Sequence, residues 1–262
     1  EDYIQEEVIP FYGNTHTTTS VTGHQSTCYR HEARQIIAES VNAKVTGRAA
    51  TDVVLFTGNG TTSSIDKLIQ GMGLNLPVPQ GYDKDKYSPV VFTSVYEHHS
   101  NLLPWRETNA EVVTIAYSPE TGVDLVDLVA KLEMYKDRAV KIGAFCTASN
   151  VTGVMTAVDE VSIILHEHLA LAFFDYATAA PYVKIDMNPV GYRNGNATRP
   201  MNTSYHQSLS QSHWDPKYIY KDAIYFSGHK FLGGVGTPGV LVVKRTVLPV
   251  VDTLPSTPGG GT

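Results

Sequence analysis

The chain contains little cysteine and no long apolar run. Cys28 and Cys146 are its only cysteines, and they do not form a CxxC pair. A fold held together by disulfides is therefore not expected, and so few thiols are typical of a reducing compartment. No apolar run approaches the roughly 20 residues of a transmembrane helix, and the acidic start EDYIQEEVIP lacks the basic and apolar regions of a signal peptide. We expect a cytoplasmic protein, or an organellar one if a targeting segment precedes residue 1, with no membrane partner.

Positive charge is also scarce. Lys and Arg number 20 against 26 Asp and Glu, which gives a net charge of −6, and no basic cluster is interleaved with aromatic residues. A nucleic-acid partner is therefore not expected. The segment HEHLA places His166 and His168 two positions apart, on different faces of a helix, and not at the HExxH spacing of zinc proteases. No metal site is expected, and both histidines are interpreted as ordinary helix residues.

Short apolar segments rich in β-branched residues alternate with amphipathic segments along most of the chain. This alternation predicts an α/β fold with a mostly parallel, seven-stranded sheet between helices. The predicted strands are 52–57, 89–95, 111–117, 141–148, 169–175, 223–227 and 239–244. Helices are predicted at 30–44, 123–137 and 157–170, and the last two carry apolar stripes at helical spacing: Leu125, Leu128, Val129 and Leu132 on one, Val158, Val161, Ile164 and Leu165 on the other.

One stretch interrupts this alternation. Residues 187–221 are polar, rich in Asn, Ser and Tyr, and show no clear periodicity. The stretch is too long for an ordinary connection between elements. It is either a surface insertion, which is the more common case, or a lid over the functional site, because long loops in compact domains often carry function.

Polar residues follow the predicted strands at their carboxyl ends, where open α/β sheets bind ligands. GNGTTSS follows 52–57, YEHHSN follows 89–95 and SNVTG follows the core of 141–148; Asp175 ends 169–175, and Ser227, His229 and Lys230 follow 223–227. GNGTTSS leads into a helix and favours a phosphate at that helix's N-terminus. It lacks the third glycine of GxGxxG and the GK[ST] of a P-loop, so a nucleotide-binding domain is a weaker interpretation.

The combination of these residues has a chemical meaning that none has alone. Pyridoxal 5'-phosphate requires a lysine amine for a Schiff base, a carboxylate to keep its pyridine nitrogen protonated, and donors for its phosphate. A lone Lys230 is more often a solvated amine, and a lone Asp175 is more often a strand-end residue. Together with the glycine-rich turn they predict a pyridoxal 5'-phosphate site in which Lys230 holds the aldehyde.

Five segments in a fixed order resemble one known family. TGNGTTSS, EHHSNLLPW, ASNVTGV, FFDYATA and YFSGHKFLGGVGTPGVLVV are similar to the class V aminotransferases of fold-type I pyridoxal-phosphate enzymes, the branch that includes cysteine desulfurases and selenocysteine lyases. The resemblance spans roughly residues 11–262. It implies an N-terminal substrate-side segment at 1–21 and a large cofactor-binding domain at 22–262, and it implies that the family's smaller C-terminal domain is absent from this chain.

The resemblance also implies residue roles. Lys230 would carry the Schiff base and move the α-proton, Asp175 would pair with the pyridine nitrogen, and His98, rather than His99, would stack on the ring; these are the predicted catalytic residues. Further cofactor contacts are implied for Gly60, Thr61, Asn150, Thr178, Ser227, His229 and, from the neighbouring chain of a homodimer, Thr262. Weaker candidates on the substrate side are Asn14, Thr15 and His16.

Two departures limit the resemblance. Thr178 stands where the family commonly has glutamine, so one contact to the cofactor's phenolic oxygen is lost or replaced. The small domain would supply the arginine for the substrate carboxylate and, in desulfurases, the cysteine that accepts sulfur. Cys146 is expected in mid-strand within the core, and nothing near Cys28 predicts a cofactor.

We therefore expect an enzyme of the aminotransferase or the cysteine desulfurase and selenocysteine lyase type, acting on an amino acid as its small-molecule substrate. The alternative is a non-catalytic or truncated homologue that binds the cofactor or a partner chain.

Overall fold

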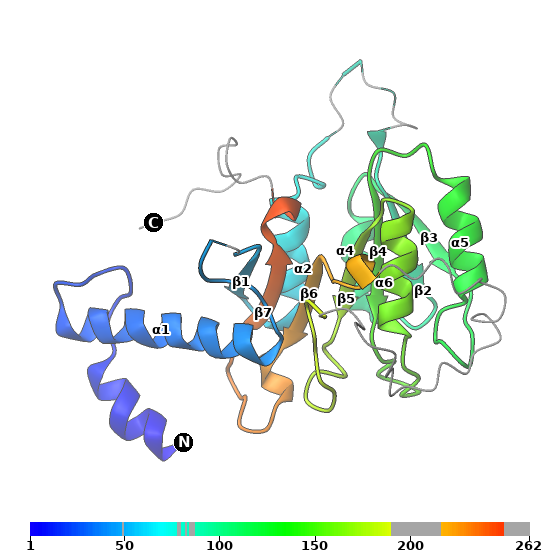
Figure 1. Cartoon of the computed structure of the whole chain (residues 1–262). Helices are drawn as coiled ribbons and strands as arrows, with labels where there is room; N and C mark the ends of the chain where they lie inside the picture. Colours follow the sequence, from blue (N-terminus) through cyan, green and yellow to red (C-terminus); the bar gives the residue numbers. More distant parts are fainter. Residues whose placement is uncertain (49, 78–79, 82, 84–86, 190–215, 249–262) are drawn as a thin grey trace.

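The computed structural model describes residues 1–48, 50–77, 80–81, 83, 87–189 and 216–248, and its centre is one sheet of seven strands (Figure 1). The strands are β1 (Asp52–Thr57), β2 (Val90–Ser94), β3 (Glu111–Ile115), β4 (Lys141–Cys146), β5 (Leu171–Asp175), β6 (Ala223–Ser227) and β7 (Gly239–Lys244). Their order is β1-β7-β6-β5-β4-β2-β3, and only β7 runs antiparallel to its neighbours. The predicted mostly parallel, seven-stranded sheet is confirmed.

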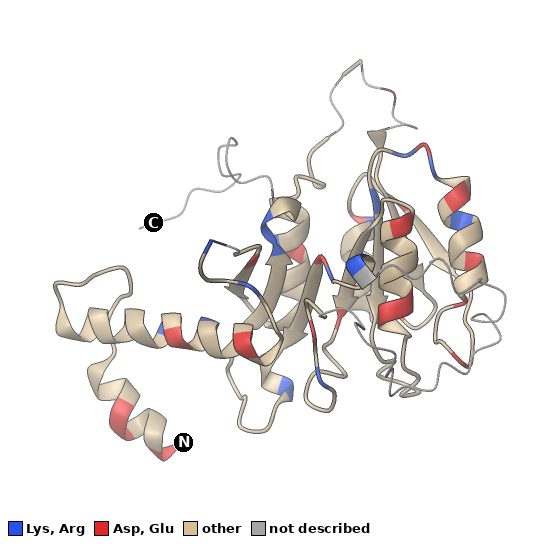
Figure 2. Ribbon diagram, viewed as in Figure 1, with Lys and Arg blue, Asp and Glu red and all other residues tan. Residues whose placement is uncertain are grey.

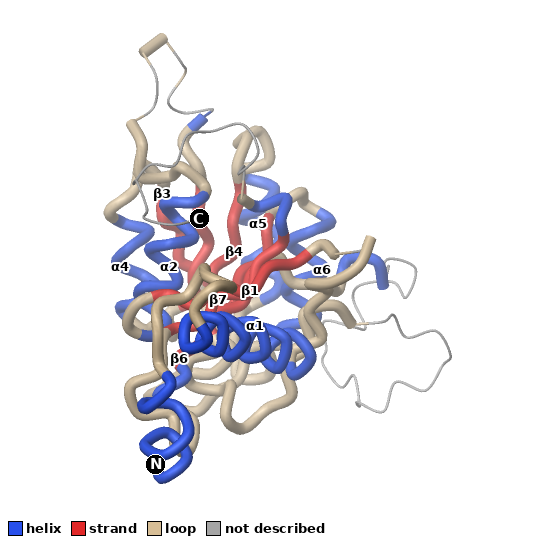
Figure 3. Tube along the Cα trace, turned by 90° about the vertical axis from the view of Figure 1, so that its left-hand side faces the viewer, coloured by secondary structure: helices blue, strands red, loops and turns tan. Residues whose placement is uncertain are grey.

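Helices cover both faces of this sheet. The longer ones are α1 (Val21–Ser40), α2 (Gly60–Gly71), α4 (His99–Arg106), α5 (Leu125–Met134) and α6 (Val158–Glu167). α2 and α4 pack on one face, through Ile65, Leu68 and Trp105, whereas α5 and α6 pack on the other, through Leu128 and Leu165 (Figure 3). Since the central strands are buried on both faces, their sequences read as nearly continuous apolar runs, and the two apolar stripes predicted for α5 and α6 face the core.

Several boundaries differ from the sequence prediction, and two of the differences have a local structural explanation. α1 begins at Val21 instead of 30, because the Ser20 hydroxyl accepts a hydrogen bond from the Gly23 N–H at 3.3 Å and caps the helix. β4 ends at Cys146 instead of 148, and Ala148 forms an isolated bridge to Met155 as the chain turns back. Figure 1 shows the N-terminal residues and the first part of α1 extending away from the sheet.

The described ends of the polar stretch 187–221 are held near the amino-terminal ends of the parallel strands, on the side of the sheet away from their carboxyl ends. Asn188 donates from Nδ2 to Asp52 Oδ2 at 2.7 Å, at the start of β1, and the Lys221 N–H donates to the Met187 carbonyl at 3.1 Å. Lys244, at the end of the antiparallel β7, pairs with Asp52 at 2.7 Å. Residues 190–215, on which the choice between insertion and lid depends, lie outside the described part of the chain.

Lys and Arg are dispersed over several helices and strands (Figure 2).

His166 makes two polar contacts within the fold. Its Nε2 lies 2.8 Å from Asp222 Oδ2, and its Nδ1 lies 2.6 Å from the Tyr218 carbonyl. The interpretation of His166 as an ordinary helix residue agrees with these contacts. Within the described residues, no helix has the length and apolar character needed to cross a bilayer.

Candidate functional site

The turn from β1 into α2 meets the carboxyl end of β6. The Thr61 N–H donates to the Ser227 hydroxyl at 2.9 Å, and the two hydroxyls lie 2.8 Å apart. Gly60 has a φ of +67°, and a Cβ on it would lie 2.9 Å from both Ser227 Oγ and His229 Cε1. Only glycine fits both the backbone conformation and the space. The result is a small cradle of hydroxyls and N–H groups at the N-terminus of α2, where anions are favoured.

Lys230 reaches this edge because of the way β6 ends. All residues of β6 are buried, and a single 3-10 turn at Gly228–Lys230 follows. His229 and Lys230 are exposed. A Cβ on Gly228 would lie 2.6 Å from Thr237 Oγ1, so the missing side chain lets the loop at Thr237 pack closely against this turn. The backbone therefore carries the lysine from a buried strand directly to the open edge of the sheet.

Asp175 ends β5 next to β6 and is 4% exposed. Its Oδ1 accepts a hydrogen bond from the Ala177 N–H at 2.7 Å. Burial raises the pKa of this carboxyl to about 6, while the Ala177 N–H and the positive charge of Lys230 lower it. A buried carboxylate beside an amine is suited to hold the proton of a cationic ligand group.

His98 caps the N-terminus of α4. Its Nδ1 accepts a hydrogen bond from the Ser100 N–H at 3.1 Å, so the neutral ring carries its proton on Nε2. The Ser100 hydroxyl in turn accepts a hydrogen bond from Thr62 Oγ1 of α2 at 2.8 Å. His99 lies instead in a separate groove between α2 and α4. His98 therefore lines the pocket described next and His99 does not, while the stacking role of His98 stays a prediction.

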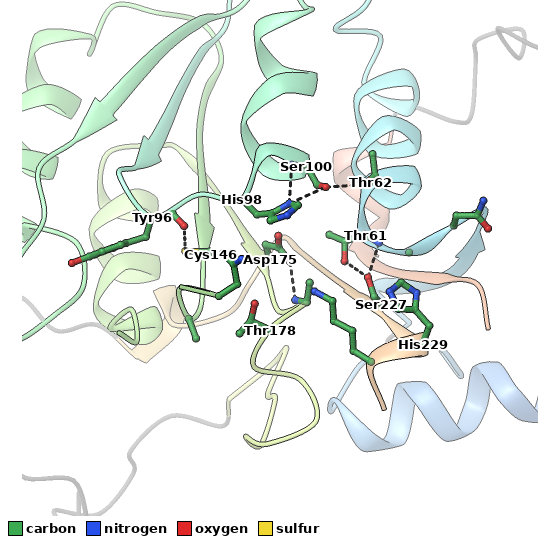
Figure 4. Close-up of a pocket in the computed structure, with 16 residues that line it drawn as sticks. Thr61, Thr62, Tyr96, His98, Ser100, Cys146, Asp175, Thr178, Ser227 and His229 are labelled. Carbon is green, nitrogen blue, oxygen red and sulfur yellow. Dashed lines mark hydrogen bonds between the residues drawn. The ribbon is translucent and has the colours of Figure 1, made fainter. Parts of the chain in front are cut away.

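These side chains surround one pocket of about 220 Å³ (Figure 4). The predicted residues that line it are Gly60, Thr61, His98, Asn150, Asp175, Thr178, Ser227, His229 and Lys230. Figure 4 shows Thr61, Ser227 and His229 on one side, His98 and Asp175 near the middle, and Tyr96 and Cys146 on the other side. Five segments separated in sequence therefore contribute to one small space at the carboxyl ends of the parallel strands.

Several residues that line this pocket were not predicted from the sequence. They are Asn59, Thr62, Tyr96, Ser100, Cys146, Ala148 and Ala177. Most of them neighbour predicted residues, and YEHHSN already contained Tyr96 and Ser100. The placement of Cys146 in mid-strand was wrong, because β4 ends at this residue; its side chain is buried yet lines the pocket. Burial raises the pKa of its thiol, which disfavours the thiolate.

Among the described residues, the predicted Asn14, Thr15 and His16 do not line this pocket. They precede α1, and His16 Nε2 lies 2.9 Å from the Arg30 guanidinium of that helix. Their role on the substrate side stays a prediction. Thr262 lies outside the described residues.

The sequence of this chain also matches a known protein family. The model of the family "Aminotransferase class-V" matches residues 2–192. The chain belongs to the class-V aminotransferase family. Members of this class are pyridoxal-phosphate-dependent enzymes. The predicted resemblance to this family is confirmed, and four of the five segments that carry it lie within the matched residues.

Individual relatives of this class-V chain are named as desulfurases. A probable cysteine desulfurase from Halalkalibacterium halodurans is 28% identical over 91% of this chain and 48% of its own length. Another from Pyrococcus abyssi is 26% identical over 99% of this chain and 53% of its own length. The chain thus spans about half the length of the curated relatives it matches.

Solved structures support the fold. The apo cysteine desulfurase of Thermococcus onnurineus aligns with a TM-score of 0.65 at 23% identity, over 94% of this chain and 50% of its own. A NifS-like protein of Rickettsia africae aligns with a TM-score of 0.66 at 18% identity, over 100% of this chain and 58% of its own. The fold of this class-V chain is therefore that of the large domain of fold-type I enzymes.

Proposed function

We propose that this chain binds pyridoxal 5'-phosphate in the pocket and acts on an amino acid. The observation that carries the proposal is the meeting of three groups in one space: the exposed Lys230, the buried Asp175 and the cradle at Gly60. The cradle fits a phosphate because a Cβ on Gly60 would occupy it and because Thr61 and Ser227 present hydroxyls there.

Each residue has a task in this proposal. When bound, the cofactor supplies a protonated ring that withdraws electrons from a bond at the α-carbon of the substrate. Lys230 would hold the cofactor through its Nζ and would move the α-proton of the substrate. Asp175 would pair with the protonated ring nitrogen, and its buried position would strengthen that ion pair because water is excluded. His98 would contact the ring, and the N-terminus of α2 with Thr61, Ser227 and His229 would receive the phosphate.

The names of the relatives favour one reaction type. Proteins matched over most of this chain are called cysteine desulfurases. We therefore infer that the reaction is removal of sulfur or selenium from cysteine or selenocysteine, in preference to amino transfer. Thr178 lines the pocket where the family commonly has glutamine. A hydroxyl there can still donate a hydrogen bond to a ligand oxygen, although its reach is shorter than that of glutamine.

The proposal extends to assembly and location. We infer a homodimer in which Thr262 contacts the neighbouring chain's phosphate, with 1–21 on the substrate side and 22–262 as the cofactor-binding domain. A cytoplasmic location agrees with two cysteines that form no disulfide.

Turnover in the presence of added cofactor tests the proposal. The protein is mixed with pyridoxal phosphate, L-cysteine and the reductant dithiothreitol, which releases the removed sulfur as sulfide. Alanine and sulfide are measured for the wild type, for Lys230→Ala and for the exposed-lysine control Lys184→Ala. We expect alanine from the wild type and from the control, and none from Lys230→Ala. Activity in Lys230→Ala would refute the mechanism. Cofactor binding without turnover of cysteine or of other amino acids would instead favour the non-catalytic homologue.

A further inference from the structure

Glu97 is the acidic residue of YEHHSN, and the proposed function gives it no task. It lies in the loop between β2 and α4, directly before His98. Its Oε1 accepts hydrogen bonds from the Ser94 N–H at 3.3 Å, the Ser94 hydroxyl at 2.7 Å and the Cys146 N–H at 2.9 Å. Its Oε2 accepts from Asn101 Nδ2 at 2.5 Å. One carboxyl group thus receives four hydrogen bonds.

These bonds join three elements that would otherwise meet only through the loop. Ser94 ends β2, Cys146 ends β4, and Asn101 lies in the first turn of α4. The donors to Glu97 therefore come from the carboxyl ends of two strands and from the helix that His98 caps. A loop held at both of its ends and across to the next strand has little freedom to move its central residues.

The network continues through Asn101 to the other side of the site. Asn101 is fully buried, its Nδ2 also lies 3.3 Å from the Ala144 carbonyl, and its Oδ1 accepts from the Tyr225 hydroxyl at 2.7 Å. Tyr225 lies on β6 and pairs in register with Asp175 on β5. The hydrogen bonds among Glu97, Asn101 and Tyr225 therefore connect the loop after β2 to β6.

We infer that Glu97 is a positioning residue, whose hydrogen bonds to Ser94, Cys146 and Asn101 fix the loop that holds His98 at the pocket. His98 is itself exposed, so its place depends on the backbone that carries it and on the bond to the Ser100 N–H. The inference rests on the proposed function only for what His98 does to a bound cofactor.

The surroundings of Glu97 define what a substitution must preserve. The titratable groups that face it are Asp175, the Cys146 thiol and the Tyr225 hydroxyl. Burial and the charge of Asp175 raise its pKa to about 7, while its hydrogen-bond donors lower it. A glutamine keeps an oxygen that can accept from Ser94 and the Cys146 N–H, which preserves three of the four hydrogen bonds, whereas its NH₂ cannot accept from Asn101 Nδ2. Glu97→Gln is therefore the conservative variant, and Glu97→Ala removes all four bonds.

The first arm of the test needs no cofactor. Long-range ¹H–¹⁵N spectra of the apoprotein are recorded at mildly alkaline pH, and the His98 signals are assigned by their loss in His98→Ala. We expect the Nε2–H form in the wild type, in Glu97→Gln and in the exposed-carboxylate control Glu120→Ala. In Glu97→Ala we expect a mixture of tautomers, because the loop and the Ser100 contact are released. Unchanged His98 signals in Glu97→Ala would overturn the inference.

The second arm measures the affinity for pyridoxal phosphate. Glu97→Ala should weaken it about tenfold, and Glu97→Gln about twofold or less, which is the scale of a lost hydrogen-bond network. In a His98→Ala background the effect of Glu97→Ala should disappear, because Glu97 acts through His98. Full additivity of the two substitutions would contradict this.

Two further outcomes have a defined meaning. If Glu97→Ala does not fold, Glu97→Asp keeps the charge but shortens the reach, and unchanged His98 signals in that variant would overturn the inference. If the wild type binds no pyridoxal phosphate, the proposed function fails while the spectra of the apoprotein still decide the role of Glu97.

Discussion

Asp175→Asn should make the apoprotein more stable while it removes the group that the proposed chemistry needs. Asp175 is 4% exposed, and burial raises its pKa from the usual 3.8 to about 6. One pKa unit corresponds to about 1.4 kcal/mol, so ionising this carboxyl in the fold costs about 3 kcal/mol. Asparagine has the same shape, can keep the bond from the Ala177 N–H, and has no charge to bury.

The sign of the effect depends on pH. Because the folded pKa lies above the unfolded one, the folded state holds this proton more tightly between about pH 4 and 6. The free energy of unfolding of the wild type therefore falls across this range as Asp175 ionises. We expect equal stability of wild type and Asp175→Asn near pH 3.5, and an advantage of about 3 kcal/mol for the variant at pH 8.

Urea unfolding of the apoprotein, followed by circular dichroism at several pH values, measures this difference. Asp137→Asn is the matched control, because Asp137 is exposed and its substitution should change stability by about 0.5 kcal/mol or less. The reasoning would be refuted if Asp175→Asn were no more stable than the wild type at pH 8. A pH-independent gain would also refute it, because the gain would then not come from the buried charge.

Two further predictions concern the cradle and the opposite edge of the sheet. Gly60→Ala should destabilise the protein and lower its affinity for inorganic phosphate, because φ at this residue is +67° and the new Cβ would lie 2.9 Å from Ser227 Oγ. Calorimetric titration with phosphate measures this affinity, and an unchanged value would contradict the prediction. Lys244→Ala should cost about 3–5 kcal/mol, because it leaves Asp52, which is 0% exposed, without its 2.7 Å partner. Lys131→Ala, which breaks a more exposed ion pair, should cost less than about 1 kcal/mol, and equal losses in both variants would be inconsistent with this account.

Much of the fold could be predicted because its local signals agree. β1, β6 and β7 were predicted to the residue, since short β-branched runs bounded by polar turns are typical of strands buried on both faces. The carboxyl-edge rule then grouped Asp175, Ser227 and Lys230 before any distance was known. These residues lie at the carboxyl ends of strands or just after them, so their grouping could be predicted without knowledge of the strand order.

The features that could not be predicted from the sequence are mostly contacts between residues far apart in the chain. The Asp52 pair with Lys244 joins positions far apart in the chain, and no local pattern links them. Glu97 receives an N–H from Cys146 of another strand, which only the register of β2 beside β4 makes possible. The strand containing Cys146 was predicted two residues too long, since Thr147 and Ala148 are compatible with a strand and the turn after them gave no sharp signal.

The most direct test of the central claim is chemical trapping at Lys230. The protein is saturated with pyridoxal phosphate, its visible spectrum is recorded, and it is then reduced with borohydride, digested and mapped by mass spectrometry. The account predicts a yellow protein whose reduced cofactor is attached to Lys230, with no such label in Lys230→Ala and an unchanged label in Lys184→Ala. A colourless protein, or a label spread over exposed lysines with Lys230 unmodified, would contradict it.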